Sequence, residues 1–314
     1  MLVAIRPPTA FDFLKVAVLG AIWGSAFLAI RVAVPETGPS WLVFIRVIIA
    51  LFPIALFAWW RGNSLPPNAR EWRLILVMSL LNTVGPFFLI SWAELHIPAG
   101  VASLIMGVGP LGTMIAAHFT TPDDRFSGGK LLGMAFGFLG LAIIAVPDLH
   151  GGASYNLLAY GAVLGGLACY VISGTMIRFI RATPVPMMTA LNMAIAAVAM
   201  IPAIGLEPIP ALSGKGWLAA IYLGLVCTGL AYLLRTHIVL TIGQSYMSMA
   251  SYVMPLCGVF LSALLLGEAI TWPILAALAL IVAGFAVSRS RSLTSSAAGT
   301  ATRERRQSTA LPPE

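Results

Sequence analysis

The sequence predicts an all-α integral membrane protein with ten transmembrane helices arranged as two inverted five-helix repeats. Three observations lead to this prediction. Apolar runs of membrane-spanning length fill almost the whole chain, similar stretches recur about 145 residues apart, and lysine and arginine collect at alternate ends of the runs. The first observation indicates a membrane environment, the second a duplicated unit, and the third the orientation of the chain in the membrane.

The composition excludes a soluble domain. Of the 314 residues, 59% are hydrophobic and 9% are charged, whereas soluble domains carry about 25% charged residues. A spanning helix needs roughly 20 apolar residues, and such runs leave no room for a soluble catalytic domain. The runs lack the alternation of an outer-membrane barrel. Cys169, Cys227 and Cys257 lie inside apolar runs, without the spacing of a disulfide framework or a metal site.

The duplication is clearest near the ends of the two halves. Three residues of the second half lie 145 positions after similar residues of the first: Ser248 after Ser103, Pro255 after Pro110 and Glu268 after Asp123. Near the start of each half the shift is 147 positions, which relates Tyr170 to Trp23 and Arg178 to Arg31. Periodicity on this scale indicates one structural unit that is written twice.

Polar and Pro/Gly-rich breaks divide the chain into predicted spans. These cover residues 13–31, 40–60, 72–94, 98–119, 129–147, 156–178, 185–205, 216–237, 244–266 and 271–288. The connecting segments are short, so consecutive helices are expected to be neighbours. Because each half has an odd number of spans, the second half enters the membrane from the opposite side, which makes the repeat an inverted one.

The distribution of lysine and arginine predicts that both termini are cytoplasmic. With the N-terminus inside, most basic residues fall on the cytoplasmic side, while the other side receives Arg31, Lys215 and, within a span, Arg46. We therefore predict a cytoplasmic N-terminus (1–12), a first repeat (13–147), a second repeat (156–288) and a basic cytoplasmic tail (289–314). The tail has few apolar side chains and is expected to be disordered.

A resemblance to a known family rests on three stretches: GAIWGSAFLAIRVA in the first span, VFIRVIIALFPIAL in the second, and LLLGEAITWPILAALALIVAGF at the end. Together they are similar to EamA-type members of the drug/metabolite transporter superfamily over residues 13–288. The resemblance implies ten helices in two inverted repeats, cytoplasmic termini, and transport of small organic metabolites across the bacterial inner membrane. The sequence departs from the family pattern at residues 121–124 (TPDD), where the second half has LGE at 266–268.

Polar and aromatic residues recur at helical spacing inside the spans and are expected to face inward, because polar faces are costly in lipid. The candidate substrate-binding residues are Trp23, Ser79, Asn82, Thr83, Ser103, Met106, Tyr170, Ser173, Thr228, Tyr232, Ser248, Ser251 and Tyr252. The resemblance implies that the six helices carrying them surround a central cavity. Small and hydroxyl residues also mediate close helix packing, which remains the alternative for each single serine. Asn82, the most polar neutral side chain deep in a span, is the strongest candidate.

Prolines inside predicted spans suggest a mechanical role. Pro86, Pro110 and Pro255 would each remove a backbone hydrogen bond and bend a helix. We interpret them as hinges whose freed carbonyls can line the cavity. Spans five and ten instead carry glycines such as Gly137 and Gly284, which suit tight packing.

Ionisable residues are scarce deep in the spans. Every carboxylate of the spans falls near a boundary, whereas proton-coupled transporters commonly keep an ionisable group within the membrane. We therefore favour facilitated transport (uniport), with His118 as the alternative proton carrier. Arg46 is interpreted as a packing arginine, with an anchor for a substrate carboxylate as the alternative. The scarcity of deep cations disfavours phosphorylated substrates.

These observations predict a transporter that exports small organic metabolites by alternating access. Amino acids with neutral or aromatic side chains are the expected substrates, a choice that rests on the resemblance; the alternative is a drug or other metabolite exporter, with or without proton coupling. An intramembrane enzyme or receptor would need a mid-span catalytic carboxylate, paired histidines or a sensing domain, which the sequence lacks. We expect a monomer in the bilayer, with no catalytic residue, metal, cofactor or nucleic-acid partner.

Overall fold

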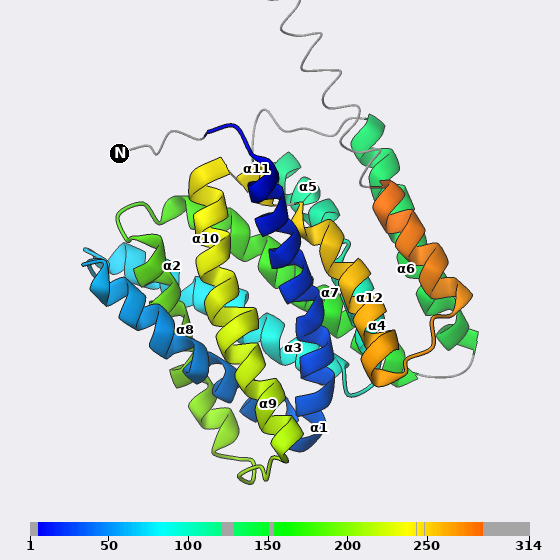
Figure 1. Ribbon diagram of the computed structural model, residues 1–314, viewed down its shortest axis with the longest axis horizontal. Helices are drawn as coiled ribbons and strands as arrows, with labels where there is room; N and C mark the ends of the chain where they lie inside the picture. The colour runs from blue at the N-terminus through cyan, green and yellow to red at the C-terminus, as the bar shows by residue number, and fades with distance from the viewer. Residues whose placement is uncertain (1–5, 121–127, 151–153, 243, 248, 285–314) are drawn as a thin grey trace, which may run out of the picture.

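The computed structural model describes residues 6–120, 128–150, 154–242, 244–247 and 249–284, and these residues form helices and no strand. Figure 1 shows long helices packed side by side. The all-helical prediction is therefore confirmed. The basic tail, Asp123, Asp124 and Ser248 lie outside the described residues.

The helices follow the predicted spans with shifts of a few residues. Their bounds are α1 Ala10–Trp60, α2 Ala69–Ser79, η1 Leu80–Val84, α3 Gly85–Ala93, α4 Ala99–Met106, α5 Gly109–Thr120, α6 Gly128–His150, α7 Ser154–Met176, η2 Ile177–Phe179, α8 Val185–Ile204, α9 Gly214–Tyr222, η3 Leu223–Leu230, α10 Ala231–Ile242, α11 Gln244–Met247 and α12 Ala250–Leu266. A last helix covers Trp272–Gly284. Within the described residues, six helical stretches are long and apolar enough to cross a membrane, and shorter apolar helices lie at Leu131–Ala145, Ala250–Leu266 and Trp272–Gly284.

The long helix α1 differs most from the prediction, because it joins the first two predicted spans. Gly38 interrupts it with a non-helical backbone (φ 68°, ψ 165°), a conformation that glycine adopts without steric penalty. Pro35 and Pro39 flank this break, and proline weakens a helix by removing an amide donor. The polar segment at residues 35–40 is therefore a kink between two helical segments and not an open loop.

The fourth predicted span is also divided. α4 ends at Met106 and α5 begins at Gly109. A Cβ added at the intervening Gly107 would lie 3.0 Å from Pro255 Cγ, so α12 approaches the chain closely at this turn. The division therefore coincides with a contact between the two halves of the sequence.

Helices of the first half pack against helices of the second. α1 contacts α8, α9, η3, α10 and α12, while α7 contacts α3, α4 and α5. Where α6 lies beside the last helix (Figure 1), a Cβ added at Gly284 would lie 2.6 Å from the Gly133 carbonyl oxygen. Close approach at glycine is typical of helices packed within a membrane, and the tight packing predicted for Gly284 is confirmed.

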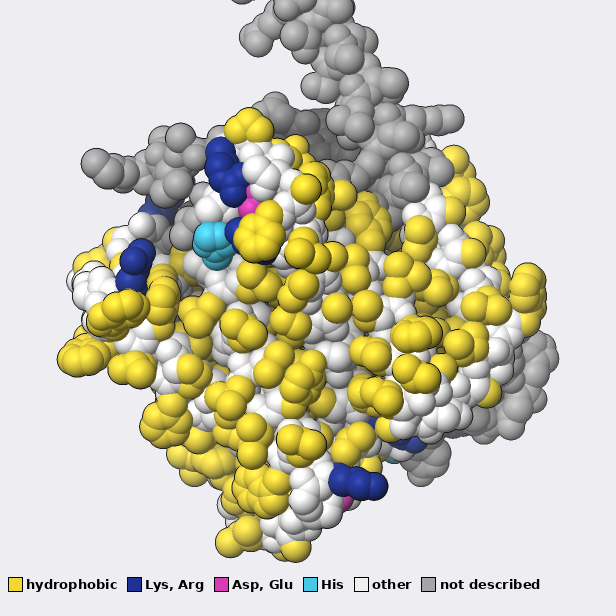
Figure 2. All heavy atoms as spheres, in the orientation of Figure 1, with side chains coloured by type: hydrophobic (Ala, Val, Ile, Leu, Met, Phe, Trp, Pro, Cys, Tyr) yellow, Lys and Arg dark blue, Asp and Glu magenta, His cyan; other side chains and the backbone are white. Residues whose placement is uncertain are grey.

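The outer surface is apolar over the middle of the helices. Figure 2 shows hydrophobic side chains covering the visible face, with Lys and Arg near its upper and lower ends. Large apolar residues such as Phe52, Trp59 and Leu218 are 70%, 76% and 70% exposed. Lipid tails accept such side chains, whereas backbone polar groups must be satisfied inside the helices. The surface is that of a multi-pass membrane protein.

Carboxylates bind backbone amides across the two halves. Glu268 accepts hydrogen bonds from the Ala99 and Gly100 amides, at 2.9 and 3.0 Å, in the first turn of α4. Glu36 accepts one at 2.7 Å from the amide of Ser213, which precedes α9. The first amides of a helix have no intrahelical partner, so these carboxylates stabilise helix starts that belong to the opposite half.

Replacing Glu268 with alanine is expected to lower the free energy of unfolding by about 1–2 kcal/mol, because the amides of Ala99 and Gly100 lose their acceptor. Thermal unfolding of the purified protein in detergent measures this change. Lys215→Ala, at an exposed position, is the control and should leave the midpoint unchanged. Equal midpoints for Glu268→Ala and the wild type would contradict the capping role.

Candidate functional site

Each half of the sequence contains one π-helical segment. η1 (Leu80–Val84) interrupts the helix between α2 and α3, and η3 (Leu223–Leu230) interrupts the helix between α9 and α10. The sequence shift of about 145 relates the two segments. A π-helical turn widens the backbone spiral and is frequent at functional sites. The segments carry three of the predicted site residues, Asn82, Thr83 and Thr228.

Asn82 joins side chains from three helical stretches. Its Nδ2 donates to the Tyr232 hydroxyl at 3.0 Å, and its Oδ1 accepts from the Ser173 hydroxyl at 3.3 Å. Ser173 also lies 3.0 Å from the carbonyl oxygen of Tyr170. We call Asn82, Tyr170, Ser173 and Tyr232 the Asn82 cluster. The structure thus brings together four predicted residues that lie on η1, α7 and α10.

Arg46 lies on the second helical segment of α1 and reaches η3. Its Nε donates to Thr228 Oγ1 at 2.8 Å, and its guanidinium carbon lies 3.7 Å from the centre of the Phe87 ring. The residue is only 7% exposed, and Thr228 is fully buried. Stacking on an aromatic face stabilises a guanidinium, so Phe87 and Thr228 hold this cation in a defined orientation.

Ser79 and Thr83 lie on the same stretch but have different surroundings. Ser79 is fully buried and donates to Asn192 Oδ1 at 2.6 Å, which makes it a contact with α8. Thr83 is also fully buried, yet its hydroxyl has no hydrogen-bond partner within the described residues. Asn192, a second deep amide, was not among the predicted residues, because no repeat or motif singles it out.

Ser103 belongs to a packing contact. Its hydroxyl donates to the Gly100 carbonyl at 2.7 Å, and a Cβ added at Gly258 would lie 2.3 Å from that hydroxyl. The packing alternative therefore describes Ser103 better than substrate binding does. Met106 is 8% exposed and lies in the apolar core, which Trp23 also borders.

The remaining candidates do not join the Asn82 cluster through a described contact. Ser251 and Tyr252 are half-buried on α12, and Ser248 lies outside the described residues. Among the prolines, Pro255 lies inside α12. Pro86 and Pro110 instead lie at the second residue of α3 and of α5, where proline fits a helical first turn. The hinge role of all three stays a prediction.

Glu94 is a residue that the sequence did not single out. It was grouped with carboxylates at span boundaries, yet it is fully buried, and neither carboxylate oxygen has a hydrogen-bond partner within the described residues. Arg31 donates instead to the backbone carbonyl of Glu94. A boundary position predicts exposure only when no other helix covers it, and the sequence does not reveal such cover.

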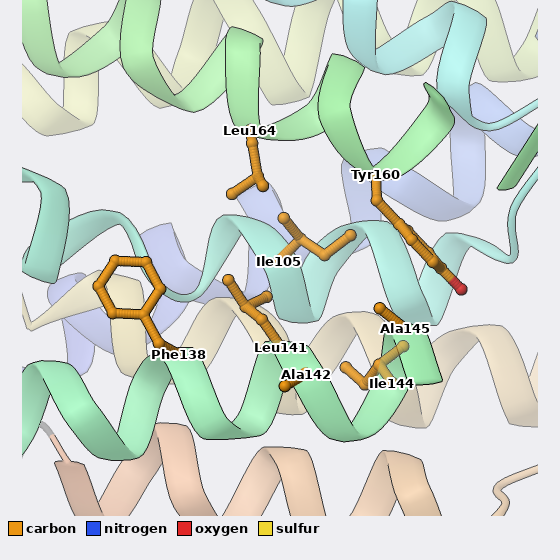
Figure 3. Close-up of a pocket in the computed structure, with 8 residues that line it drawn as sticks. All are labelled: Ile105, Phe138, Leu141, Ala142, Ile144, Ala145, Tyr160 and Leu164. Atoms are coloured by element: carbon orange, nitrogen blue, oxygen red, sulfur yellow. The ribbon is translucent and has the colours of Figure 1, made fainter. Parts of the chain in front are cut away.

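A separate pocket of about 250 Å³ lies between α4, α6 and α7. Figure 3 shows Leu164 and Tyr160 of α7 facing Phe138 and Leu141 of α6 across it, with Ile105 of α4 beside them. Apart from Tyr160 its lining is apolar, and it includes none of the predicted site residues. Within the described residues, no group of three His, Cys, Asp or Glu side chains could hold a metal ion.

Comparisons with known proteins show the family of the chain. The sequence profile of the EamA-like transporter family matches residues 13–146 and again residues 157–290. The probable terminal-alkyne amino-acid exporter of Streptantibioticus cattleyicolor is 32% identical over 153 residues, so the match spans 48% of either chain. The uncharacterized inner membrane transporter YedA of Escherichia coli K12 is 27% identical, over 80% of this chain and 81% of its own.

A solved crystal structure has the same fold. It is 22% identical in sequence, and its TM-score of 0.67 applies to 90% of this chain and 98% of the other. The helical arrangement of this chain is therefore shared with a protein of known structure.

Proposed function

The chain belongs to the EamA-like transporter family, whose members are transporters and not enzymes, and from this we propose that it exports small organic metabolites, above all amino acids with neutral or aromatic side chains. The name of the Streptantibioticus cattleyicolor relative supports amino acids as the substrate class. The name of the Escherichia coli relative supports the bacterial inner membrane as the location. The chain is a multi-pass membrane protein that handles a small molecule.

The proposed architecture is two inverted repeats of five spans each, over residues 13–147 and 156–288, with both termini in the cytoplasm. Two family matches of similar length support the repeat. Helix α1 has two segments, one on either side of Gly38. If each segment is counted as a separate span, this supports five spans in each half. The packing supports inversion, because α1 lies against α12 while α7 lies against α4 and α5. A pseudo-two-fold axis in the membrane plane would place the site between the halves.

The Asn82 cluster is the observation that carries the proposed transport site. Asn82 connects residues of both halves through its contacts with Ser173 and Tyr232. An amide offers donors and acceptors, so it can exchange these side-chain contacts for the amino and carboxyl groups of a substrate. Rocking of one half against the other would open the cluster to each side in turn. Transport would be facilitated, without a coupled proton.

Flux into proteoliposomes that contain the purified chain tests this function. We expect saturable flux of radiolabelled neutral and aromatic amino acids at a rate that does not change when a pH gradient is imposed across the membrane. Protein-free liposomes are the control. Flux that follows the proton gradient would contradict uniport and would direct attention to Glu94 and His118. Flux of other metabolites but of no amino acid would contradict the substrate class.

A further inference from the structure

Arg46 carries a buried charge that takes part in no ion pair among the described residues. Within the described residues, the ion pairs join Arg6 and Lys15 to Asp12, at the start of α1. No described carboxylate lies within 4.0 Å of Arg46, and Nε is its one nitrogen with a described hydrogen bond. A guanidinium has five N–H donors, so most of the hydrogen-bonding capacity of Arg46 is unused.

A buried cation without a counter-ion is costly. Charged side chains inside a membrane protein usually pair with an opposite charge or mark the path of a substrate or ion. The contacts with Phe87 and Thr228 stabilise the orientation of Arg46, but they contribute no negative charge. Within the described residues, no carboxylate forms a direct ion pair with the Arg46 guanidinium.

The position of Arg46 connects it to the Asn82 cluster. Tyr170, Tyr232 and the buried Glu94 lie near enough to interact electrostatically with its charge, although Glu94 forms no described ion pair with it. The two tyrosines belong to that cluster. Phe87, on which the guanidinium stacks, lies one helical turn after Thr83, whose buried hydroxyl has no described partner. An unpartnered donor and an unpaired cation thus border the same group of polar side chains.

We propose that Arg46 binds the carboxylate of the transported substrate through the terminal nitrogens of its guanidinium. A planar guanidinium matches the two oxygens of a carboxylate and forms two parallel hydrogen bonds with them. Thr228 and Phe87 position the guanidinium so that its terminal nitrogens are left for the substrate. The inference rests on the proposed function and specifies it: the substrate must carry a carboxylate, and Asn82 lies where the remaining polar groups are recognised.

The single positive charge of Arg46 favours a carboxylate over a phosphate as the group that it binds. A phosphate carries more charge and is usually bound by several cations. Among the arginines and lysines whose side chains the structure describes, Arg46 is the one that is buried. A single guanidinium pairs with a single carboxylate, and such pairing lowers the cost of keeping the Arg46 charge inside the membrane.

Equilibrium binding to the purified full chain in detergent tests this role. The probes are L-phenylalanine and L-phenylalaninamide, which differ in the carboxylate. We expect the wild type to bind the acid roughly 10- to 100-fold more tightly than the amide, the range for hydrogen bonds to a charged group. Arg46→Gln should lose this preference, because its neutral amide has no charge to offer. Arg46→Lys should retain part of the preference for the acid, since lysine keeps the positive charge but cannot form two parallel hydrogen bonds with a carboxylate.

The ratio of the two affinities separates recognition from structure. A purely structural arginine would weaken the binding of acid and amide equally, and an unchanged ratio in Arg46→Gln would overturn the inference. Arg61→Gln, at an exposed position beyond α1, is the matched control and should keep the wild-type ratio. If Arg46→Gln does not fold, Thr228→Val carries the test, because it removes the partner of Nε and should also reduce the ratio.

A second pair of probes separates this inference from the proposed function. If no amino acid is transported in proteoliposomes, the substrate class is wrong, but benzoate and benzamide still report on Arg46. Tighter binding of benzoate that is lost in Arg46→Gln supports a carboxylate anchor for another substrate. Equal binding of benzoate and benzamide by the wild type, or no binding of either, overturns the inference.

Discussion

Replacing Gly24 with valine is expected to leave little folded protein in the membrane. A Cβ at this position would lie 2.5 Å from the Met254 carbonyl oxygen and 2.8 Å from Cys257 Cβ. Real Cβ atoms do not come so near a backbone oxygen, so α1 and α12 would have to separate. Overpacking of a rigid contact destabilises by roughly 3 kcal/mol, and this contact joins the two halves of the chain.

The yield of monodisperse protein and the midpoint of thermal unfolding measure this effect. Gly161→Val is the matched control: Gly161 also lies in a helix, α7, but a Cβ there would meet no atom within 4 Å. The control carries the same cost of a β-branched residue in a helix, so the difference between the variants isolates the contact. Equal yields and midpoints would show that α1 and α12 do not meet closely at Gly24.

Replacing Asn82 with alanine is expected to reduce transport by roughly ten-fold or more while the amount of folded protein stays unchanged. The substitution removes the donor to Tyr232 and the acceptor for Ser173. It also leaves the half-buried Tyr232 hydroxyl without its donor, whereas Ser173 keeps its hydrogen bond to the Tyr170 carbonyl. In the proposed site, the substrate would lose the same amide. Initial rates of flux in proteoliposomes, normalised to incorporated protein, measure the change.

Asn192→Ala is the control for this prediction. Asn192 is also a buried amide and accepts a hydrogen bond from Ser79, but it lies outside the Asn82 cluster. We expect it to lower stability and to leave the flux per folded molecule close to that of the wild type. Unchanged flux in Asn82→Ala would remove Asn82 from the transport site. Equal losses of flux in both variants would indicate a general effect of removing a buried amide.

Much of the fold could be predicted from the sequence, because membrane spans depend on local properties. Composition and the length of the apolar runs suffice to predict helices, since an isolated stretch in lipid must satisfy its own backbone. Glycine and proline residues predicted the breaks between helices, because their effect on the backbone is also local. The error at α1 has a local cause as well, because PETGPS looks like a loop, yet Gly38 alone leaves the helical conformation.

The candidate site was only partly predictable. Helical spacing identified Asn82, Ser173 and Tyr232 as residues on inward faces. It could not show that they touch one another, because the hydrogen bonds of Asn82 join residues 91 and 150 positions apart. Ser103 had the same spacing and polarity, but it lies against Gly258 in a packing contact. Periodicity predicts which face a residue occupies, and it does not predict which helix faces it.

By itself, the sequence determined the helical character of the chain, its membrane environment and its duplication, since these follow from the composition and order of neighbouring residues. The tertiary structure decided which polar groups lack a partner. Arg46 was interpreted from the sequence as a packing arginine, and the structure shows it bonded to Thr228, 182 positions away, with no described ion pair. Glu94 was placed only near a span boundary by the sequence, and the structure shows it fully buried. Burial and charge pairing depend on contacts between distant segments, and folding alone brings those segments together.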